Sequence, residues 1–277
     1  MPASSRSRRP DARASGIPGL LWVPAGIALA FLILPLIALI AQVPWGDIGD
    51  VVAESGVVQS LALSLGAGAA ATFFCVILGV PLAWVLARSV EWNPALRRLF
   101  RALVVVPLVL PPVVGGIALV LLLGRTGVIG GPLNALFGIQ IPFTTPAVII
   151  SETFVALPFM VLAVEGALRG VDRRLEDAAE TLGASRWRIF RRISLPLIAP
   201  GVAAGAVLAF ARALGEFGAT ITFAGDFPGV TRTMPIAAYI ALESDPGAAY
   251  VIALILLIVA VGVLFALRDR WIGGLTA

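Results

Sequence analysis

The stretch LIAPGVAAGAVLAFARALGEFGATITF, residues 197–223, is almost entirely apolar and contains only two charged side chains, Arg212 and Glu216. A helix rises 1.5 Å per residue, so about 20 such residues cross the hydrocarbon core of a bilayer. Charged groups inside a membrane span are costly and normally face the interior of a helix bundle or a watery path. The stretch therefore predicts a membrane-spanning helix with one polar position on its inner face.

Five further stretches of similar length and apolar character occur along the chain. They are residues 20–43, 61–87, 102–124, about 146–164 (which includes Glu152) and 248–266. The composition agrees, because 59% of residues are hydrophobic, 13% are charged and the mean hydropathy is +1.00, whereas soluble domains carry about a quarter charged residues. Residues 127–141 are also uncharged, but glycines and a proline interrupt them, which predicts a loop with a short interfacial helix. The fold class is an all-α integral membrane protein with six transmembrane helices.

The arginines predict the orientation of these spans. All but three precede the first span, follow the last, or lie between spans two and three or four and five; the exceptions are Arg125, Arg212 and Arg232. Positive residues accumulate in cytoplasmic loops, so both termini are expected on the cytoplasmic side of the membrane. Residues 1–16 are rich in Arg, Ser and Pro and predict a disordered basic tail, and residues 17–277 are expected to form a single six-helix transmembrane domain. This placement favours contact with anionic membrane lipid and argues against nucleic-acid binding.

Several catalytic chemistries are excluded by residue types that the chain lacks. All 20 basic residues are arginine, there is no histidine, and Cys75 is the single cysteine. Without lysine there is no Walker A loop, and without histidine there is neither a Ser-His-Asp triad nor a histidine-ligated metal. Cys75 lies in the second span and is expected to fill apolar space. The chain is therefore expected to be neither a P-loop ATPase nor a triad hydrolase, and to hold no metal.

Residues 169–196 predict two short helices that project from the bilayer. Asp172 can cap a helix that runs to Leu182, Gly183 can end it in a left-handed conformation, and Ser185 can cap a second helix over Arg186–Ile193. Pro196 then opens the next span. Periodicity alone is equally consistent with an amphipathic interfacial loop and with a docking site for another protein.

The same loop resembles the EAA motif of permeases of ATP-binding-cassette (ABC) importers. The matching positions are Asp177, Ala178, Ala179, Gly183, Ile193, Leu195 and Pro196. The family consensus has glutamate where Asp177 stands, which keeps the charge on a shorter side chain. The resemblance implies the transmembrane permease domain of a type I importer in the cell membrane of a prokaryote. The same resemblance implies that the chain itself is non-catalytic and that its loop couples to two cytoplasmic ABC ATPase subunits that use ATP and Mg. It also implies an extracytoplasmic binding protein, a second copy of the chain, and no cofactor bound by this chain.

The choice of substrate depends on two further stretches. Residues 211–220 and 223–235 look like the corresponding region of molybdate permeases, and less closely like those for tungstate and sulfate. The resemblance covers most of the chain after Gln59, including Pro107–Pro112. It implies import of a tetrahedral oxyanion, with molybdate favoured.

Five residues of span five are candidates for the transport path or its gate: Arg212, Gly215, Glu216, Phe217 and Gly218. Arg212 and Glu216 are one helical turn apart, so they can form an ion pair that neutralises both groups. That interpretation is favoured over direct anion binding by Arg212, because the adjacent carboxylate would repel a dianion.

The remaining carboxylates leave two other classes of protein to consider. Glu152 is expected to be a buried carboxyl between helices, and Glu165 and Arg169 to form a structural pair. The competing functions are an ion-coupled secondary carrier that uses Glu152 and Glu216, and, less favoured, a membrane-embedded enzyme that uses the same carboxylates.

Overall fold

The computed structural model describes residues 19–54, 56–89 and 92–272. The predicted basic tail, residues 1–16, lies outside the described residues. The described chain separates at Val43 and Pro44 into two units, and each is described by itself. The prediction of a single domain over residues 17–277 therefore stays a prediction.

The first unit is one apolar helix. A short 3-10 turn, η1 (Gly19–Leu21), leads into α1 (Trp22–Gln42), none of whose residues is buried. Its length and hydropathy suffice to cross a membrane, which fits a helix whose side chains are solvated by lipid tails.

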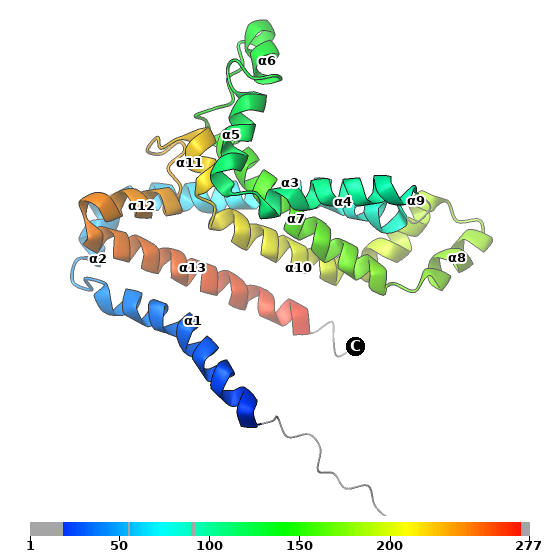
Figure 1. Ribbon diagram of the computed structural model, residues 1–277, viewed down its shortest axis with the longest axis horizontal. Helices are drawn as coiled ribbons and strands as arrows, with labels where there is room; N and C mark the ends of the chain where they lie inside the picture. The colour runs from blue at the N-terminus through cyan, green and yellow to red at the C-terminus, as the bar shows by residue number, and fades with distance from the viewer. Residues whose placement is uncertain (1–18, 55, 90–91, 273–277) are drawn as a thin grey trace, which may run out of the picture. The chain divides into compact units, whose positions relative to one another are not determined.

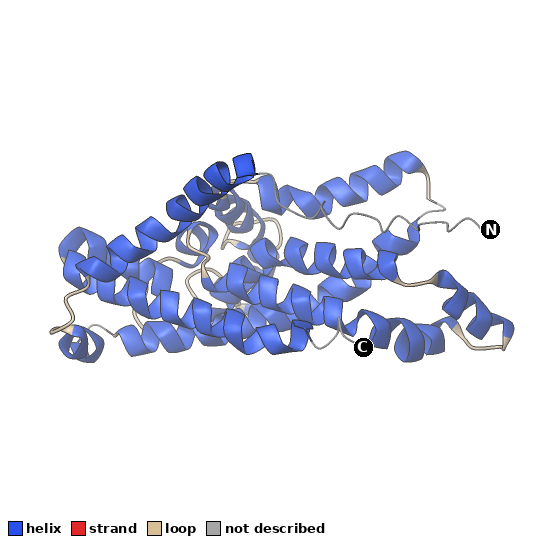
Figure 2. Ribbon diagram, turned by 90° about the horizontal axis from the view of Figure 1, so that it is seen from below, coloured by secondary structure: helices blue, strands red, loops and turns tan. Residues whose placement is uncertain are grey.

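The second unit consists of helices joined by loops, with no strand among its described residues (Figures 1 and 2). Its elements are α2 (Ile48–Glu54), α3 (Val57–Arg88), α4 (Pro94–Val109), α5 (Pro112–Leu123), α6 (Gly130–Phe137), α7 (Thr145–Gly170), α8 (Arg173–Thr181), α9 (Arg186–Ile189), the π-helical turn η3 (Phe190–Ser194), α10 (Leu195–Leu214), α11 (Gly218–Ala224), α12 (Met234–Ser244) and α13 (Pro246–Ile272). The short helix α6 lies within residues 127–141, where a short helix was predicted, and its place at the membrane interface stays a prediction.

The described helices provide five membrane spans, and a sixth if the bent pair α4 and α5 is counted as one. This confirms the predicted all-helical membrane fold. The core of the second unit lies where α3, α7 and α10 pack together. Small residues allow close contact there; a Cβ on Gly205 would lie 3.2 Å from the Cβ of Ala163, and Cys75 is fully buried in the same cluster.

The third span, predicted over residues 102–124 with a kink at its prolines, is broken into two helices. The helix runs through Pro107 and stops at Val109, and α5 then leaves at 114° to α4 (Figure 1). Leu110 and Pro111 are both extended, with ψ near 130°. A residue before proline avoids the helical region, and Pro111 and Pro112 lack the N–H groups that would continue the helix. Pro112 instead begins α5, where its missing N–H costs nothing.

The fifth span is shorter than the predicted residues 197–223. α10 ends at Leu214, and the chain turns at Gly215 before α11 begins at Gly218. The Glu216 side chain explains the break, since its Oε1 accepts a hydrogen bond from the Ala219 N–H at 2.8 Å and so caps α11. A helix end needs such acceptors for its free N–H groups.

Candidate functional site

The loop between α7 and α10 is shaped by the capping residues predicted from sequence. Asp172 Oδ1 accepts a hydrogen bond from the Arg174 N–H at 3.0 Å, and Ser185 Oγ accepts one from the Arg188 N–H at 3.4 Å. Gly183 has φ +80°, the left-handed conformation that ends α8. These three predictions are confirmed.

The second short helix, predicted over Arg186–Ile193, is not separate from the next span. α9, η3 and α10 form one helix from Arg186 to Leu214. The backbone widens into a π-turn, in which the Leu195 N–H bonds to the Phe190 carbonyl. This turn directly precedes Pro196, which cannot donate the hydrogen bond of a regular helix. The loop is therefore joined rigidly to α10.

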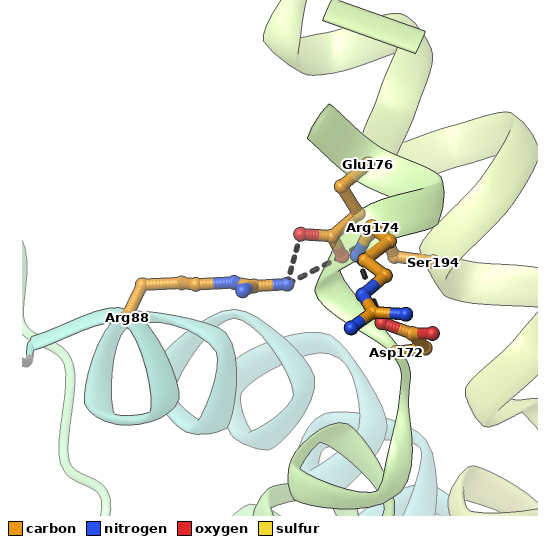
Figure 3. A network of polar contacts seen from close by, with 5 residues as sticks. All are labelled: Arg88, Asp172, Arg174, Glu176 and Ser194. Carbon is orange, nitrogen blue, oxygen red and sulfur yellow. Dashed lines mark hydrogen bonds and ion pairs between the residues drawn. The ribbon is translucent and has the colours of Figure 1, made fainter. Parts of the chain in front are cut away.

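A polar cluster holds this loop against the end of α3 (Figure 3). Arg88 Nη2 donates to both carboxylate oxygens of Glu176, and the Ser194 hydroxyl donates to Glu176 Oε1 at 2.7 Å. The Arg88 guanidinium also lies 4.9 Å from the ring centroid of Trp84. Glu176 therefore connects three elements: α8, the end of α3 and the start of α10.

The motif residues of the loop differ in exposure. Asp177, Ala178, Gly183 and Pro196 are exposed, whereas Ala179, Ile193 and Leu195 are partly buried. Leu182 and Trp187 add apolar surface, with 88% and 68% of each residue exposed. The outer side of the loop thus offers acidic, small and apolar groups to a partner.

The anchoring residues Arg88, Glu176 and Ser194 were not identified from the sequence. Arg88 and Glu176 are separated by 88 residues, and both occur among many other charged residues of the same regions. No local spacing rule pairs them. The predicted pair Glu165 and Arg169 does form, at 2.9 Å, and Arg101 joins it at 2.5 Å.

The second candidate region lies at the far end of α10. Arg212 Nη1 lies 2.6 Å from Glu216 Oε2; the side chains are 26% and 1% exposed. The predicted ion pair is therefore present. Glu216 serves both as partner of Arg212 and as cap of α11, while Arg212 stays accessible.

The other residues of this region occupy different positions. The Phe217 ring lies 5.0 Å from the ring of Tyr239 on α12. Gly218 is buried against α5, and Gly215 is exposed. Glu152 is buried on α7, and its Oε2 has no hydrogen-bond partner among the described residues.

The two glycines give a matched test of this packing. A Cβ on Gly218 would lie 2.8 Å from the Pro112 Cβ, whereas one on Gly215 would meet only the Ala211 carbonyl at 3.7 Å. We expect Gly218→Ala to lower the free energy of unfolding by about 1–3 kcal/mol, as overpacking does elsewhere, and Gly215→Ala to leave it near wild type. Thermal unfolding in one detergent measures both. Equal melting temperatures for the two variants would contradict the close contact of α5 and α11.

Comparison with known proteins identifies the family. Residues 79–274 match the family described as binding-protein-dependent transport system inner membrane component. Over 254 residues the chain is 46% identical to the molybdenum transport system permease protein ModB of Mycobacterium tuberculosis, which covers 92% of this chain and 95% of the relative. It is 42% identical to the ModB protein of Escherichia coli K12, over 77% and 92% of the two chains.

Solved structures share the fold at low sequence identity. A chain of a bacterial ABC transporter involved in import of the acidic polysaccharide alginate has a TM-score of 0.69 and 21% identity, and the match covers 91% of this chain and 93% of that one. A chain of the MetNI methionine ABC transporter gives a TM-score of 0.57 at 20% identity, with 79% and 94% covered.

The fold is that of the transmembrane domain of a type I ABC importer. The chain belongs to the family of inner membrane components of binding-protein-dependent transport systems. Permeases of this family are generally non-catalytic and bind no cofactor.

Proposed function

We propose that this chain is the permease subunit of an ABC importer that moves molybdate into the cytoplasm. The observation that carries the proposal is the 46% identity to a molybdenum transport permease over nearly the full length of both chains. Alternating access of the helix bundle would move the oxyanion, and a separate ATPase would hydrolyse ATP with Mg. Tungstate and sulfate are chemically similar tetrahedral oxyanions and are the substrates to compare.

The proposal includes a defined assembly and orientation. One chain supplies one coupling loop, and two ATPase subunits require two, so twofold symmetry implies a second copy of the chain. The arginine-rich loops are proposed to face the cytoplasm, with both termini on that side. An extracytoplasmic binding protein would deliver the oxyanion to the opposite face.

The outer side of the α8–α9 loop is the proposed contact with the ATPase. Asp177, Ala178 and Gly183 are exposed there, and small side chains permit close approach by another protein. The motif continues into the helix that leads to α10, with Ile193, Leu195 and Pro196. Ala179, on α8, is partly buried. We assign to these seven residues the transfer of motion from the ATPase to the membrane helices.

Two connections would transmit that motion into the bundle. Glu176 ties the loop to Arg88 on α3 and to Ser194 at the start of α10. The continuous helix from Arg186 to Leu214 then links the loop to the Arg212–Glu216 pair at its other end. A displacement of α8 would therefore reach the proposed gate through a continuous packed helix and not through a flexible linker. The gate residues are Arg212, Gly215, Glu216, Phe217 and Gly218.

Purification of the complex from its native membrane in mild detergent tests the assembly. We expect a P-loop ATPase to co-purify in stoichiometric amount and to be lost on Gly183→Trp, because a large side chain at φ +80° is strained and alters the exposed turn. Gly138→Trp is the matched control, since Gly138 also ends a helix with φ +66° and open space around it. Retention of the ATPase by Gly183→Trp, or its equal loss from the control, would count against the loop as the docking site.

The substrate is tested separately with the purified complex in liposomes that contain the binding protein. Molybdate is expected to stimulate ATP hydrolysis and to be taken up at lower concentration than tungstate or sulfate. A preference for tungstate or sulfate would leave the importer assignment intact and would contradict molybdate as the substrate.

A further inference from the structure

A groove between α4 and α7 changes from basic to apolar along its length. At the end near α8 a cavity of about 260 Å³ is lined by five arginines: Arg88, Arg97, Arg101, Arg169 and Arg173. No carboxylate in the part of the chain that the structure describes lines this cavity. Such a density of guanidinium groups at a membrane helix end favours a phosphate group.

The arginines of this cavity are only partly neutralised. Glu165 pairs with Arg101 and Arg169, and Glu176 pairs with Arg88. Among the described residues no carboxylate pairs with Arg97 or Arg173. The Nε of Arg101 is buried and has no hydrogen-bond partner among the same residues. An anion in the cavity would satisfy these donors.

The groove continues from this cavity toward the middle of the bundle. A second hollow of about 140 Å³, whose lining includes Glu165 in its ion pairs with Arg101 and Arg169, shares Arg101 with the basic cavity and shares Val104 with a third hollow of about 310 Å³. The third hollow is lined by apolar side chains, among them Leu103, Pro107 and Phe154. A soluble phosphate would use only the first cavity, whereas a molecule with a charged head and a hydrocarbon chain would fill all three.

We propose that this groove is a binding site for one anionic phospholipid per chain. Its phosphate contacts Arg97, Arg101 and Arg173, and one acyl chain lies against Leu103 and Phe154. Basic pockets between membrane helices bind anionic headgroups on the side of the membrane that carries the arginine-rich loops. The site adjoins the Arg88–Glu176 contact, so bound lipid would steady the base of the α8–α9 loop. Binding of the phospholipid requires only that the chain spans a membrane, and it does not depend on which oxyanion the chain transports.

Native mass spectrometry of the delipidated complex tests the site, with phosphatidylglycerol and phosphatidylcholine of equal chain length as probes. We expect phosphatidylglycerol to bind about one molecule per chain at least tenfold more tightly than phosphatidylcholine. Arg97→Gln should remove most of this preference. Arg98→Gln is the matched control, because Arg98 is the next residue of α4, is exposed and lines none of the three hollows.

A second variant and a competitor separate the lipid from a soluble anion. Val104→Trp would fill the middle hollow and should weaken phosphatidylglycerol binding several-fold while the arginines stay in place. Glycerol phosphate at millimolar concentration should not displace the lipid. Equal loss with Arg98→Gln would overturn the proposal in favour of general surface charge, and displacement by glycerol phosphate or an unaffected Val104→Trp would overturn it in favour of a soluble phosphate site.

Discussion

Arg88→Glu is expected to reduce oxyanion uptake to less than a tenth of the wild-type rate while the complex still hydrolyses ATP. The substitution places a second carboxylate against Glu176, which is only 12% exposed and currently accepts two hydrogen bonds from Arg88. Hydrogen bonds to charged groups contribute about 1.5–3 kcal/mol each, so α8 would lose its main attachment to α3. Movement of the ATPase would then displace the loop without moving the bundle. Uptake and ATP hydrolysis measured on the same liposomes give the coupling ratio.

The reversed pair decides whether the contact itself is responsible. Arg88→Glu combined with Glu176→Arg restores opposite charges across the same gap and is expected to recover at least a third of the uptake. Glu176→Gln should have an intermediate effect, because the glutamine amide oxygen can still accept the hydrogen bond from the Ser194 hydroxyl but the neutral amide cannot form an ion pair with Arg88. If the double variant is as defective as Arg88→Glu alone, the contact of loop and α3 is not what transmits the motion.

Those parts of the fold that depend on neighbouring residues could be predicted from the sequence. The six apolar stretches correspond to the observed spans, with the third present as a bent pair. The caps at Asp172, Gly183 and Ser185 act within three residues of themselves, so their residue types alone indicate where α8 begins and ends and where α9 begins.

The details that were wrong arise from competition between local signals. Pro107, Pro111 and Pro112 all predict a kink in the third span, and the break falls at the adjacent prolines Pro111 and Pro112, because two successive residues without an N–H group cannot continue the hydrogen bonds of the helix. In the fifth span, apolar residues continue past Gly215 and hide a helix end. Glu216 placed three residues before Ala219 is a capping pattern that could have revealed it.

Long-range partners could not be predicted at all. Glu176 stands beside Asp177 and close to Glu180, and nothing in one sequence distinguishes the carboxylate that turns inward from those that stay exposed. The choice depends on where α3 ends, and that is set by the packing of α3 against α7 and α10. The same packing brings Arg97 and Arg101 of α4 and Arg173 of α8 around one cavity.

Arg212→Gln alone is expected to lower the free energy of unfolding far more than removal of both charges of the Arg212–Glu216 pair. Arg212→Gln leaves the carboxylate of Glu216 buried and without its charged partner, and breaking such a pair typically costs about 3–5 kcal/mol. Replacing both residues by glutamine removes the two charges together. The side-chain amide oxygen introduced by Glu216→Gln still accepts the hydrogen bond from the Ala219 N–H that caps α11. The double variant should therefore unfold within about 1 kcal/mol of wild type, as additivity fails for paired groups. Thermal and denaturant unfolding of the purified wild-type chain, the two single variants and the double variant give the free energies for this double-mutant cycle.

Glu216→Gln separates the stability of the pair from its proposed role in transport. This variant keeps the cap on α11 but exposes an unneutralised Arg212 to the path. An oxyanion that meets a free guanidinium is held more firmly, by roughly tenfold for each 1.4 kcal/mol gained, so we expect oxyanion retention by the complex to rise and uptake to fall. Wild-type uptake and wild-type coupling in Glu216→Gln would show that the carboxylate only fastens α10 to α11. Faster uptake would instead indicate that Glu216 obstructs the anion, and Arg212 would then be a contact of the transport path.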